Sequence, residues 1–170
     1  QGIDAISACF SVKTRPRLKK ATVLGFECRK IDLADALVFL RTELSDKVQL
    51  SDRAYADLAV YFQNLIQRDL LDVRAVYINK TTLLCVGFFM ATPKALVFVK
   101  GVANEAGRKL AANQFLLFEV MKESVFKFER FDFSGSSVPA IATFFKSFGA
   151  TEEFYQRFTG GSLKRIINLT

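Results

Sequence analysis

The stretch FDFSGSSVPAIATFFKSFGA, residues 131–150, constrains the fold more than any other part of this chain. Phe131 and Phe133 alternate with Asp132, which is the period of a strand with two unlike faces. Gly135 then predicts a turn. The stretch therefore indicates a strand that ends abruptly in a Gly-Ser turn.

A short helix over residues 138–148 is predicted directly after this turn. Ser137 can cap the helix, and a first turn tolerates Pro139. Gly149 is typical of the residue that follows the last turn of a helix. From these signals alone two interpretations stay open, a joint without chemistry and part of a functional site.

The length and composition predict one domain over residues 1–170. The chain is long enough to bury a core, and 51% of its 170 residues are hydrophobic, with 18 phenylalanines among them. No apolar run has the length of a membrane span, and no secretory signal is present. We therefore expect a folded domain without a membrane-spanning segment.

The residue types present exclude several kinds of site. The chain has no histidine, which excludes a histidine-dependent catalytic triad. Its three cysteines, Cys9, Cys28 and Cys85, are scattered, which favours reduced thiols in a cytoplasmic protein and predicts no metal site. Chemistry must come from carboxylates, lysine, arginine, tyrosine, serine or backbone groups.

Positive charge is concentrated near the N-terminus. The net charge is +7, and residues 1–30 contribute +5 of it, because seven basic residues there face only two acidic ones. Such a patch suits a phosphate-bearing partner, with transfer RNA as one candidate. A solvated helical surface is the alternative interpretation.

Hydrophobic periodicity predicts the order of the remaining elements. A strand is expected over residues 22–28, and two helices follow, one with the apolar face Leu33, Leu37, Leu40 and Leu44 and one capped by Ser51. Three neighbouring strands should then form an antiparallel meander, with Asn79-Lys80 as a tight turn between the first two. One long helix, the strand and helix described above, and a last hairpin follow. From the meander onward, the ranges are 72–79, 81–90, 95–101, 104–123, 128–134, 138–148 and 153–169.

This order resembles the GNAT acyltransferase fold. The resemblance implies an α/β (α+β) domain with a mixed, mostly antiparallel sheet whose parallel fourth and fifth strands, 95–101 and 128–134, diverge and leave room for an acyl carrier. Helices should flank the sheet, and the long helix should supply the crossover that a parallel pair needs.

Three segments sharpen the resemblance. They are similar to motifs of Fem-type peptidoglycan aminoacyltransferases and their bacterial relatives. The segments are KTRPRLKKA at 13–21, NEAGRKLAANQFLLFEVM at 104–121 and the stretch at 131–150. These proteins contain two GNAT-like units in tandem. We therefore expect the chain, which begins at Gln1, to be the C-terminal unit, with an N-terminal GNAT-like unit as partner. Much of the groove for an amine acceptor, such as a cell-wall precursor, would belong to that partner.

The resemblance also implies where the carrier's phosphates would lie. GNAT proteins usually carry Q/R-x-x-G-x-G/A at the start of the crossover helix, where backbone N–H groups meet an anion. This chain has Asn104, Gly107 and Lys109 in that spacing, so lysine replaces the small residue. We expect weak binding of acetyl-coenzyme A and a donor that is either an acyl-coenzyme A or an aminoacyl-tRNA. Arg108 and Lys109 are candidate phosphate ligands, with exposed helical cations as the alternative.

Further site residues follow from the same resemblance. Backbone N–H groups around Val99, Lys100 and Gly101 would polarise the reacting carbonyl. Lys146 matches a lysine that lies near the carrier's phosphates in the Fem family.

Two side chains are candidates for the proton steps. Asp132 is the candidate base, although it could simply hydrogen-bond the turn after it. Tyr155 could protonate the leaving group, with a half-buried core tyrosine as the alternative.

Three functions remain open from the sequence. The leading hypothesis is an N-acyl or aminoacyl transferase, and the second is a non-catalytic GNAT-like binding module of a larger protein. The altered helix-start motif favours the second. RNA binding by the basic N-terminal segment ranks third, because the segment lacks interleaved aromatic residues.

Overall fold

The computed structural model describes residues 2–45, 50–135 and 138–153. Its elements follow one another as α1 (Ile3–Ala8), α2 (Thr14–Val23), β1 (Glu27–Lys30), α3 (Leu33–Leu44), α4 (Asp52–Ile66), β2 (Leu71–Ile78), β3 (Thr82–Ala91), β4 (Ala95–Ala103), α5 (Glu105–Lys109), α6 (Ala112–Ser124), β5 (Arg130–Asp132) and α7 (Pro139–Lys146). Within this part of the chain no helix has both the length and the apolar character that crossing a membrane requires.

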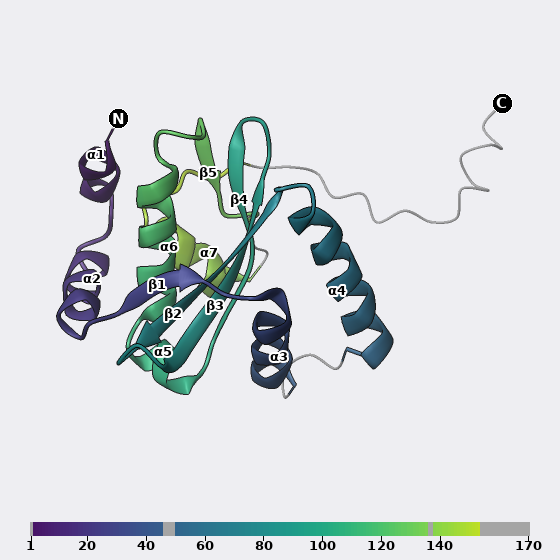
Figure 1. Ribbon diagram of the computed structural model, residues 1–170. Coiled ribbons are helices and arrows are strands. Elements are labelled where there is room, and N and C mark those ends of the chain that lie inside the picture. The colour runs from purple at the N-terminus through teal and green to yellow at the C-terminus, as the bar shows by residue number, and fades with distance from the viewer. Residues whose placement is uncertain (1, 46–49, 136–137, 154–170) are drawn as a thin grey trace, which may run out of the picture.

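The strands form one sheet in the order β1-β2-β3-β4-β5 (Figure 1). The pairs from β1 to β4 are antiparallel, whereas β5 runs parallel to β4. This confirms the predicted mixed sheet and its parallel fourth and fifth strands. The crossover that joins them contains α5 and α6, as the parallel pairing requires.

The predicted meander of β2, β3 and β4 is confirmed. Asn79 and Lys80 connect β2 to β3 with φ angles of 53° and 65°. Positive φ at both central residues is the mark of a tight hairpin turn whose twist matches that of the strands. The hairpin register is therefore fixed locally.

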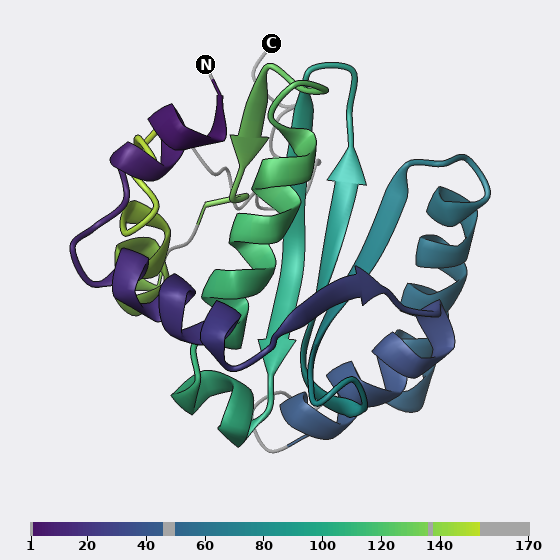
Figure 2. The same ribbon diagram turned by 60° about the vertical axis from the view of Figure 1, so that its left-hand side comes forward.

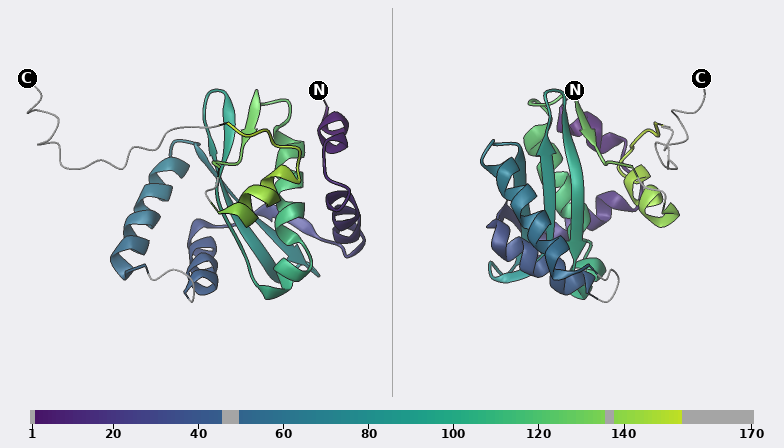
Figure 3. Two further views of the ribbon diagram at one scale, coloured as in Figure 1. Left: turned by 180° about the vertical axis from the view of Figure 1, so that it is seen from behind. Right: turned by 90° about the vertical axis from the view of Figure 1, so that its right-hand side faces the viewer.

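Helices cover both faces of the sheet (Figure 3). The face under α3 and α4 holds one core, in which Phe62 stacks on Phe88 with ring centroids 4.9 Å apart. The other core lies under α6 and α7 and contains Phe89. Because consecutive residues of a strand point to opposite faces, the fully buried pair Phe88 and Phe89 supplies one ring to each core.

The predicted strand over residues 22–28 begins later than expected. Thr22 and Val23 belong to α2, and β1 starts only at Glu27. Thr22 satisfies its hydroxyl inside the helix by donating to the Leu18 carbonyl at 3.1 Å. Gly25, at φ 69°, then turns the chain toward the sheet, which places the boundary.

The predicted long helix over residues 104–123 is wrong, because the chain forms two helices there. α5 ends at Lys109, and Ala111 adopts φ 61° before α6 begins. The break lets α5 lie against the end of β3 while α6 packs along the sheet, where Ala112 and Leu116 are fully buried.

The predicted helix over 138–148 is confirmed as α7, and Gly149 follows it at φ 76°. The N-terminal segment holds the end of this helix, since Ser11 N–H and Thr14 Oγ1 both donate to the Ser147 carbonyl, at 2.8 and 3.2 Å. Ser137, the predicted cap, lies outside the described residues, as do Tyr155 and nearly all of the predicted last hairpin.

Arg74 on β2 ties the sheet to the end of α6. Its guanidinium donates to Asp72 at 2.7 Å and to Glu123 at 2.6 Å. Burial would lower the pKa of Arg74, but these hydrogen bonds outweigh it and raise the pKa. On the neighbouring strand, burial raises the pKa of the Cys28 thiol to about 12, although the positive charge of Arg74 opposes the shift.

Candidate functional site

The parallel strands β4 and β5 stay together over a short length only. Ala95, Leu96 and Val97 pair with Arg130, Phe131 and Asp132, and no further pair follows. β4 continues to Ala103. Beyond Val97, the edge of β4 that faces β5 therefore has no partner strand among the described residues. We call this edge, between β4 and the end of β5, the β4–β5 opening (Figure 2).

A β-bulge lies at this opening. On β3, Phe88 pairs with Lys100 while Phe89 pairs with Phe98, so Val99 has no opposite residue. Val99 is 38% exposed. Bulges bend a strand and turn backbone groups out of the ladder, and they are common beside functional sites. Of the predicted stretch Val99, Lys100 and Gly101, the structure thus places Val99 at the irregular point of the edge.

α7 forms an aromatic wall beside the opening. Phe145 stacks on Phe133, with ring centroids 4.8 Å apart, and meets Phe98 edge-on at 6.2 Å. Gly101 makes room for this packing, because a Cβ there would come within 2.6 Å of the Phe98 ring. The sequence analysis missed Phe98 as part of the site, because a phenylalanine in an apolar strand gives no functional signal of its own.

Lys146 is the last residue of α7. Its Nζ forms an ion pair with Glu152 at 2.8 Å, and about half of its side chain is exposed. Phe145 and Phe148 are buried and Phe144 packs against the same core, which confirms that these rings fix the helix. Lys146 thus projects from a firmly packed helix that flanks the opening.

Asp132 lies at the point where the β4–β5 pairing ends. It is the register partner of Val97, and its Oδ1 accepts a hydrogen bond from the Ser134 N–H at 2.7 Å. Ser134 has φ 60°, so the carboxylate stabilises a left-handed turn. The turn contact that the sequence analysis kept as an alternative is therefore present, at a position beside the opening.

The start of α5 explains the Asn-x-x-Gly spacing. Asn104 caps the helix by accepting the Gly107 N–H on Oδ1 at 2.7 Å, and its Nδ2 donates to the Leu83 carbonyl at 2.9 Å. Gly107 passes so close to β3 that an added Cβ would lie 2.2 Å from the Leu84 oxygen. Both residues thereby dock α5 on the sheet, and one of its first-turn N–H groups is already used.

The two predicted helical cations both have partners. Arg108 donates to the Ala103 carbonyl and forms an ion pair with Glu43 at 3.6 Å. Lys109 forms an i,i+4 pair with Glu105 at 2.6 Å. Both side chains therefore contribute to the surface around α5, and a phosphate would have to compete with carboxylates for them.

No protein-family model matches the chain, and no curated protein matches it. Solved structures do match. FemX superposes with a TM-score of 0.71 at 12% identity, over 88% of this chain and 56% of FemX. A predicted acetyltransferase from Clostridium acetobutylicum, solved with acetyl-CoA, gives 0.58 at 16% identity, over 78% of this chain and 96% of its own. This chain therefore spans a little over half of FemX.

Glucosamine-6-phosphate N-acetyltransferase from Arabidopsis thaliana gives a TM-score of 0.57 at 13% identity, over 81% of this chain and 99% of the enzyme. At such identities the likeness shows the fold alone. Together with the sheet order and the parallel β4–β5 pair, it establishes that this chain has the GNAT fold.

Proposed function

We propose that this domain transfers an acyl or aminoacyl group from a carrier to an amine at the β4–β5 opening. The observation that carries the proposal is the bulge at Val99 on a strand edge that β5 no longer covers. Extended carriers bind such edges through backbone groups, as an added strand does. The match to a predicted acetyltransferase solved with acetyl-CoA supports an acyl-coenzyme A as a possible kind of donor.

The backbone of the bulge would act on the reacting carbonyl. N–H groups of Val99, Lys100 and Gly101 that face the opening can donate to the carbonyl oxygen as negative charge develops on it. Backbone donors are held by the sheet, so they need no rearrangement during the reaction. Because this role does not use the side chains, it is compatible with the different residue types at these three positions.

The reaction needs a base for the amine and an acid for the leaving group. The amine loses a proton when it attacks the carbonyl, and the leaving thiol or ribose hydroxyl gains one. Asp132 stands where the opening begins and is the candidate base, directly or through a water molecule. Tyr155 remains the candidate acid for the leaving group.

The donor is either an acyl-coenzyme A or an aminoacyl-tRNA. Lys109 in place of a small residue favours the larger carrier, and the cations of α2 would then contact its phosphates. Lys146 would hold a phosphate near the opening once Glu152 releases it.

The acceptor and setting are proposed from the resemblance to Fem-type proteins. The chain would be the C-terminal unit of a cytoplasmic bacterial protein, with an N-terminal GNAT-like unit completing the acceptor groove. The amine would then belong to a cell-wall precursor. The match to FemX supports this setting as far as the fold reaches.

A backbone-specific substitution tests the proposal. Val99→Pro removes one N–H at the bulge, whereas Val99→Ala keeps it and serves as the matched control. In single-turnover transfer from acetyl-coenzyme A or aminoacyl-tRNA to amines, we expect Val99→Pro to lose about 10²–10³-fold in rate. Full activity in a folded Val99→Pro protein would show that the carbonyl of the transferred group does not bind at the bulge. Asp132→Asn, which preserves the acceptor for Ser134, gives a second test if the proline variant does not fold.

A non-catalytic binding module is the second candidate. It is favoured by the contacts that occupy Asp132, Arg108 and Lys109. It predicts that a carrier binds the chain stoichiometrically without turnover of any amine, a result that the same assay separates from transfer.

A further inference from the structure

Thr14, the first residue of α2, is a buried polar residue that the proposed reaction does not use. Among the described residues only Thr14 and Ser124 are both polar and buried, with 2% and 7% of their surface exposed. Ser124 satisfies its hydroxyl within its own helix, by donating to the Met121 carbonyl. Thr14 instead donates to the Ser147 carbonyl, 133 positions away at the end of α7. Its hydroxyl therefore links the N-terminal segment to the helix beside the β4–β5 opening.

A chain of hydrogen bonds fixes the Ser147 carbonyl. Thr14 Oγ1 donates to it at 3.2 Å and thereby uses its only hydroxyl proton, so the 3.0 Å contact between the hydroxyls of Ser11 and Thr14 is donated by Ser11. The Ser11 N–H donates to the same carbonyl at 2.8 Å. Ser147 is the first residue after α7, where carbonyls lack partners within the helix. We call Ser11 and Thr14, which supply those partners, the clasp.

Close packing accompanies these hydrogen bonds. Phe10, which is 4% exposed, meets the Phe148 ring edge-on with centroids 5.3 Å apart. Gly149 passes so near Cys9 that an added Cβ would lie 2.6 Å from the Cys9 Cβ. The end of α7 is thus held by packing against the N-terminal segment as well as by the clasp.

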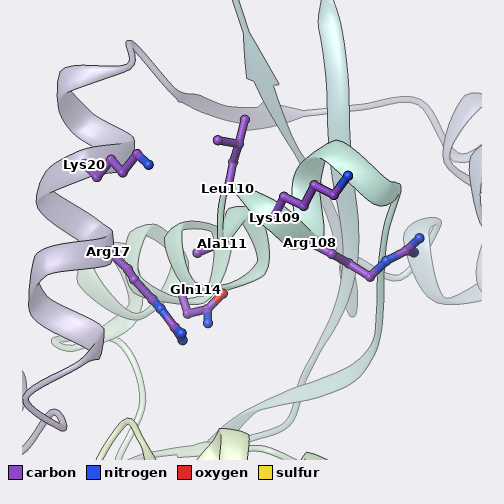
Figure 4. Close-up of a pocket in the computed structure, with 7 residues that line it drawn as sticks. All are labelled: Arg17, Lys20, Arg108, Lys109, Leu110, Ala111 and Gln114. Carbon is purple, nitrogen blue, oxygen red and sulfur yellow. The ribbon is translucent and has the colours of Figure 1, made fainter.

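The clasp is itself anchored, because α2 packs on α6. Leu18 and Ala21 of α2 are buried in the core that also contains Leu116 of α6. Gln114 of α6, with its amide oriented to suit its neighbours, accepts from Arg17 Nη1 at 3.3 Å, and Figure 4 shows these two side chains close together. The clasp therefore connects α7 to the crossover helix rather than to a loosely attached terminus.

The residues that the proposed donor site uses on α7 stand directly before the held carbonyl. Lys146 is the neighbour of Ser147 in the chain. Phe145, one position earlier, contacts Phe133 and Phe98 in the aromatic wall. α7 has eight residues, and a helix this short depends on tertiary contacts for its shape and position. The place of Lys146 beside the opening therefore depends on these rings and on the clasp.

We propose that Thr14 is a positioning residue for the donor, acting through Lys146. This role rests on the transfer proposed above, in which Lys146 holds a carrier phosphate at the β4–β5 opening. With the Ser147 carbonyl held by two donors, the last turn of α7 keeps the lysine stem in place. Without the Thr14 hydroxyl this turn relaxes, and the ammonium spends less time where the phosphate binds.

Thr14→Val tests this role, because it removes the hydroxyl and keeps the branched shape of the side chain. Thr22→Val is the matched control, since Thr22 lies on the same helix and its hydroxyl donates only to the Leu18 carbonyl, at 3.1 Å. Acetyl-coenzyme A is titrated at low salt into the ¹⁵N-labelled 170-residue chain, and amide chemical shifts, which also measure weak binding, give the affinity. Thr14→Val should weaken binding by about three- to tenfold, the equivalent of one hydrogen bond. Thr14→Ser, which keeps a hydroxyl, should restore most of the affinity, and Thr22→Val should not change it.

A double-mutant cycle shows whether Thr14 acts through Lys146. In a Lys146→Ala chain, Thr14→Val should have little further effect on affinity, because the group that it positions is gone. A purely structural role would instead lower the affinity by the same factor in both backgrounds. Such an additive loss, or an equal loss in Thr22→Val, would overturn the proposal.

Amide shifts without a donor separate this inference from the proposed function. Thr14→Val should move the amide resonances of Phe145 and Lys146, whereas Thr22→Val should leave them in place. Unmoved resonances would show that α7 does not depend on the clasp, and would overturn the positioning role alone. Moved resonances in a chain that binds neither acetyl-coenzyme A nor aminoacyl-tRNA would contradict the proposed function, and with it any part of Thr14 in donor binding. Thr14→Ala replaces the valine variant if that protein does not fold.

Discussion

The side chain of Asn104 binds two separate segments at once, accepting the Gly107 N–H at 2.7 Å and donating to the Leu83 carbonyl at 2.9 Å. It fixes the start of α5 to β3, immediately after the strand that carries the bulge. The position of the whole crossover therefore depends on one carboxamide and on the glycine that it contacts.

The first prediction concerns this contact. Asn104→Ala should lower the free energy of unfolding by about 1 kcal/mol, the usual loss for a helix cap. Gly107→Ala should cost at least about 2 kcal/mol, because the added Cβ would collide with a backbone oxygen that cannot move away. Urea unfolding measures both. Gly2→Ala is the control, since nothing lies within 4 Å of its added Cβ, and a Gly107→Ala protein as stable as this control would contradict the prediction.

The second prediction concerns Lys109. We expect the unmodified chain to bind acetyl-coenzyme A weakly, and Lys109→Ala to tighten binding by about tenfold, because a small residue lets the pyrophosphate approach. The fold should be unaffected, since the pair with Glu105 is exposed. Titration calorimetry measures the affinity, with Lys94→Ala as a control at another exposed pair. Low-micromolar binding by the unmodified chain would show that Lys109 is no obstacle.

The third prediction concerns Lys146. If its ammonium holds a carrier phosphate, Lys146→Ala should weaken donor binding by about 1.5–3 kcal/mol, the range for a hydrogen bond to a charged group. Glu152→Gln should strengthen donor binding, because it frees the lysine from its ion pair. Both effects should shrink as salt is added. Donor affinity that is unchanged in both variants at low salt would assign Lys146 to the solvated surface.

The fourth prediction concerns the thiols. Cys9 is exposed, whereas burial raises the pKa values of Cys28, to about 12, and of Cys85. At pH 8 a disulfide reagent should therefore modify one thiol quickly in the native chain and all three after denaturation. Rapid modification of two or more native thiols would show that β1 opens readily.

The same shift fixes a pH dependence. The ordinary pKa of a cysteine thiol is 9.0, so the folded state keeps the Cys28 proton after the unfolded state has lost it. Its contribution to stability is present in full below pH 9 and is lost as the pH rises toward 12. Cys28→Ala should flatten the alkaline fall in unfolding free energy relative to the unmodified chain.

Much of the fold was predictable because local signals agreed with the global arrangement. Asn79-Lys80 predicted a tight turn, Ser51 predicted the start of a helix and Gly149 predicted the end of one. The structure has all three, and the Ser51 side chain caps its helix. Each of these residues acts on backbone groups within a few positions of itself. Such effects can be predicted from a short window of sequence.

The incorrect predictions concern residues whose conformation depends on parts of the chain far from them in sequence. Ala111 is a strong helix former within a run of helix formers, yet it has φ 61° at the point where α5, docked on β3, gives way to α6. Likewise, the sequence around β5 does not show that its pairing with β4 ends at Asp132. The bulge at Val99 and the Phe98–Phe145 contact, which lie just beyond this point, join residues far apart in the chain.

The hydrogen bond from Thr14 to the Ser147 carbonyl joins residues 133 positions apart. Closing so long a loop costs more entropy than forming the β2–β3 hairpin, so α7 should dock late in folding, after the sheet exists. Because α7 is held by the N-terminal segment, its amide protons should exchange with solvent through a local opening in which the N-terminal helices take part. α7, which lies beside the β4–β5 opening, would then be the part of the candidate site that folds last and opens first.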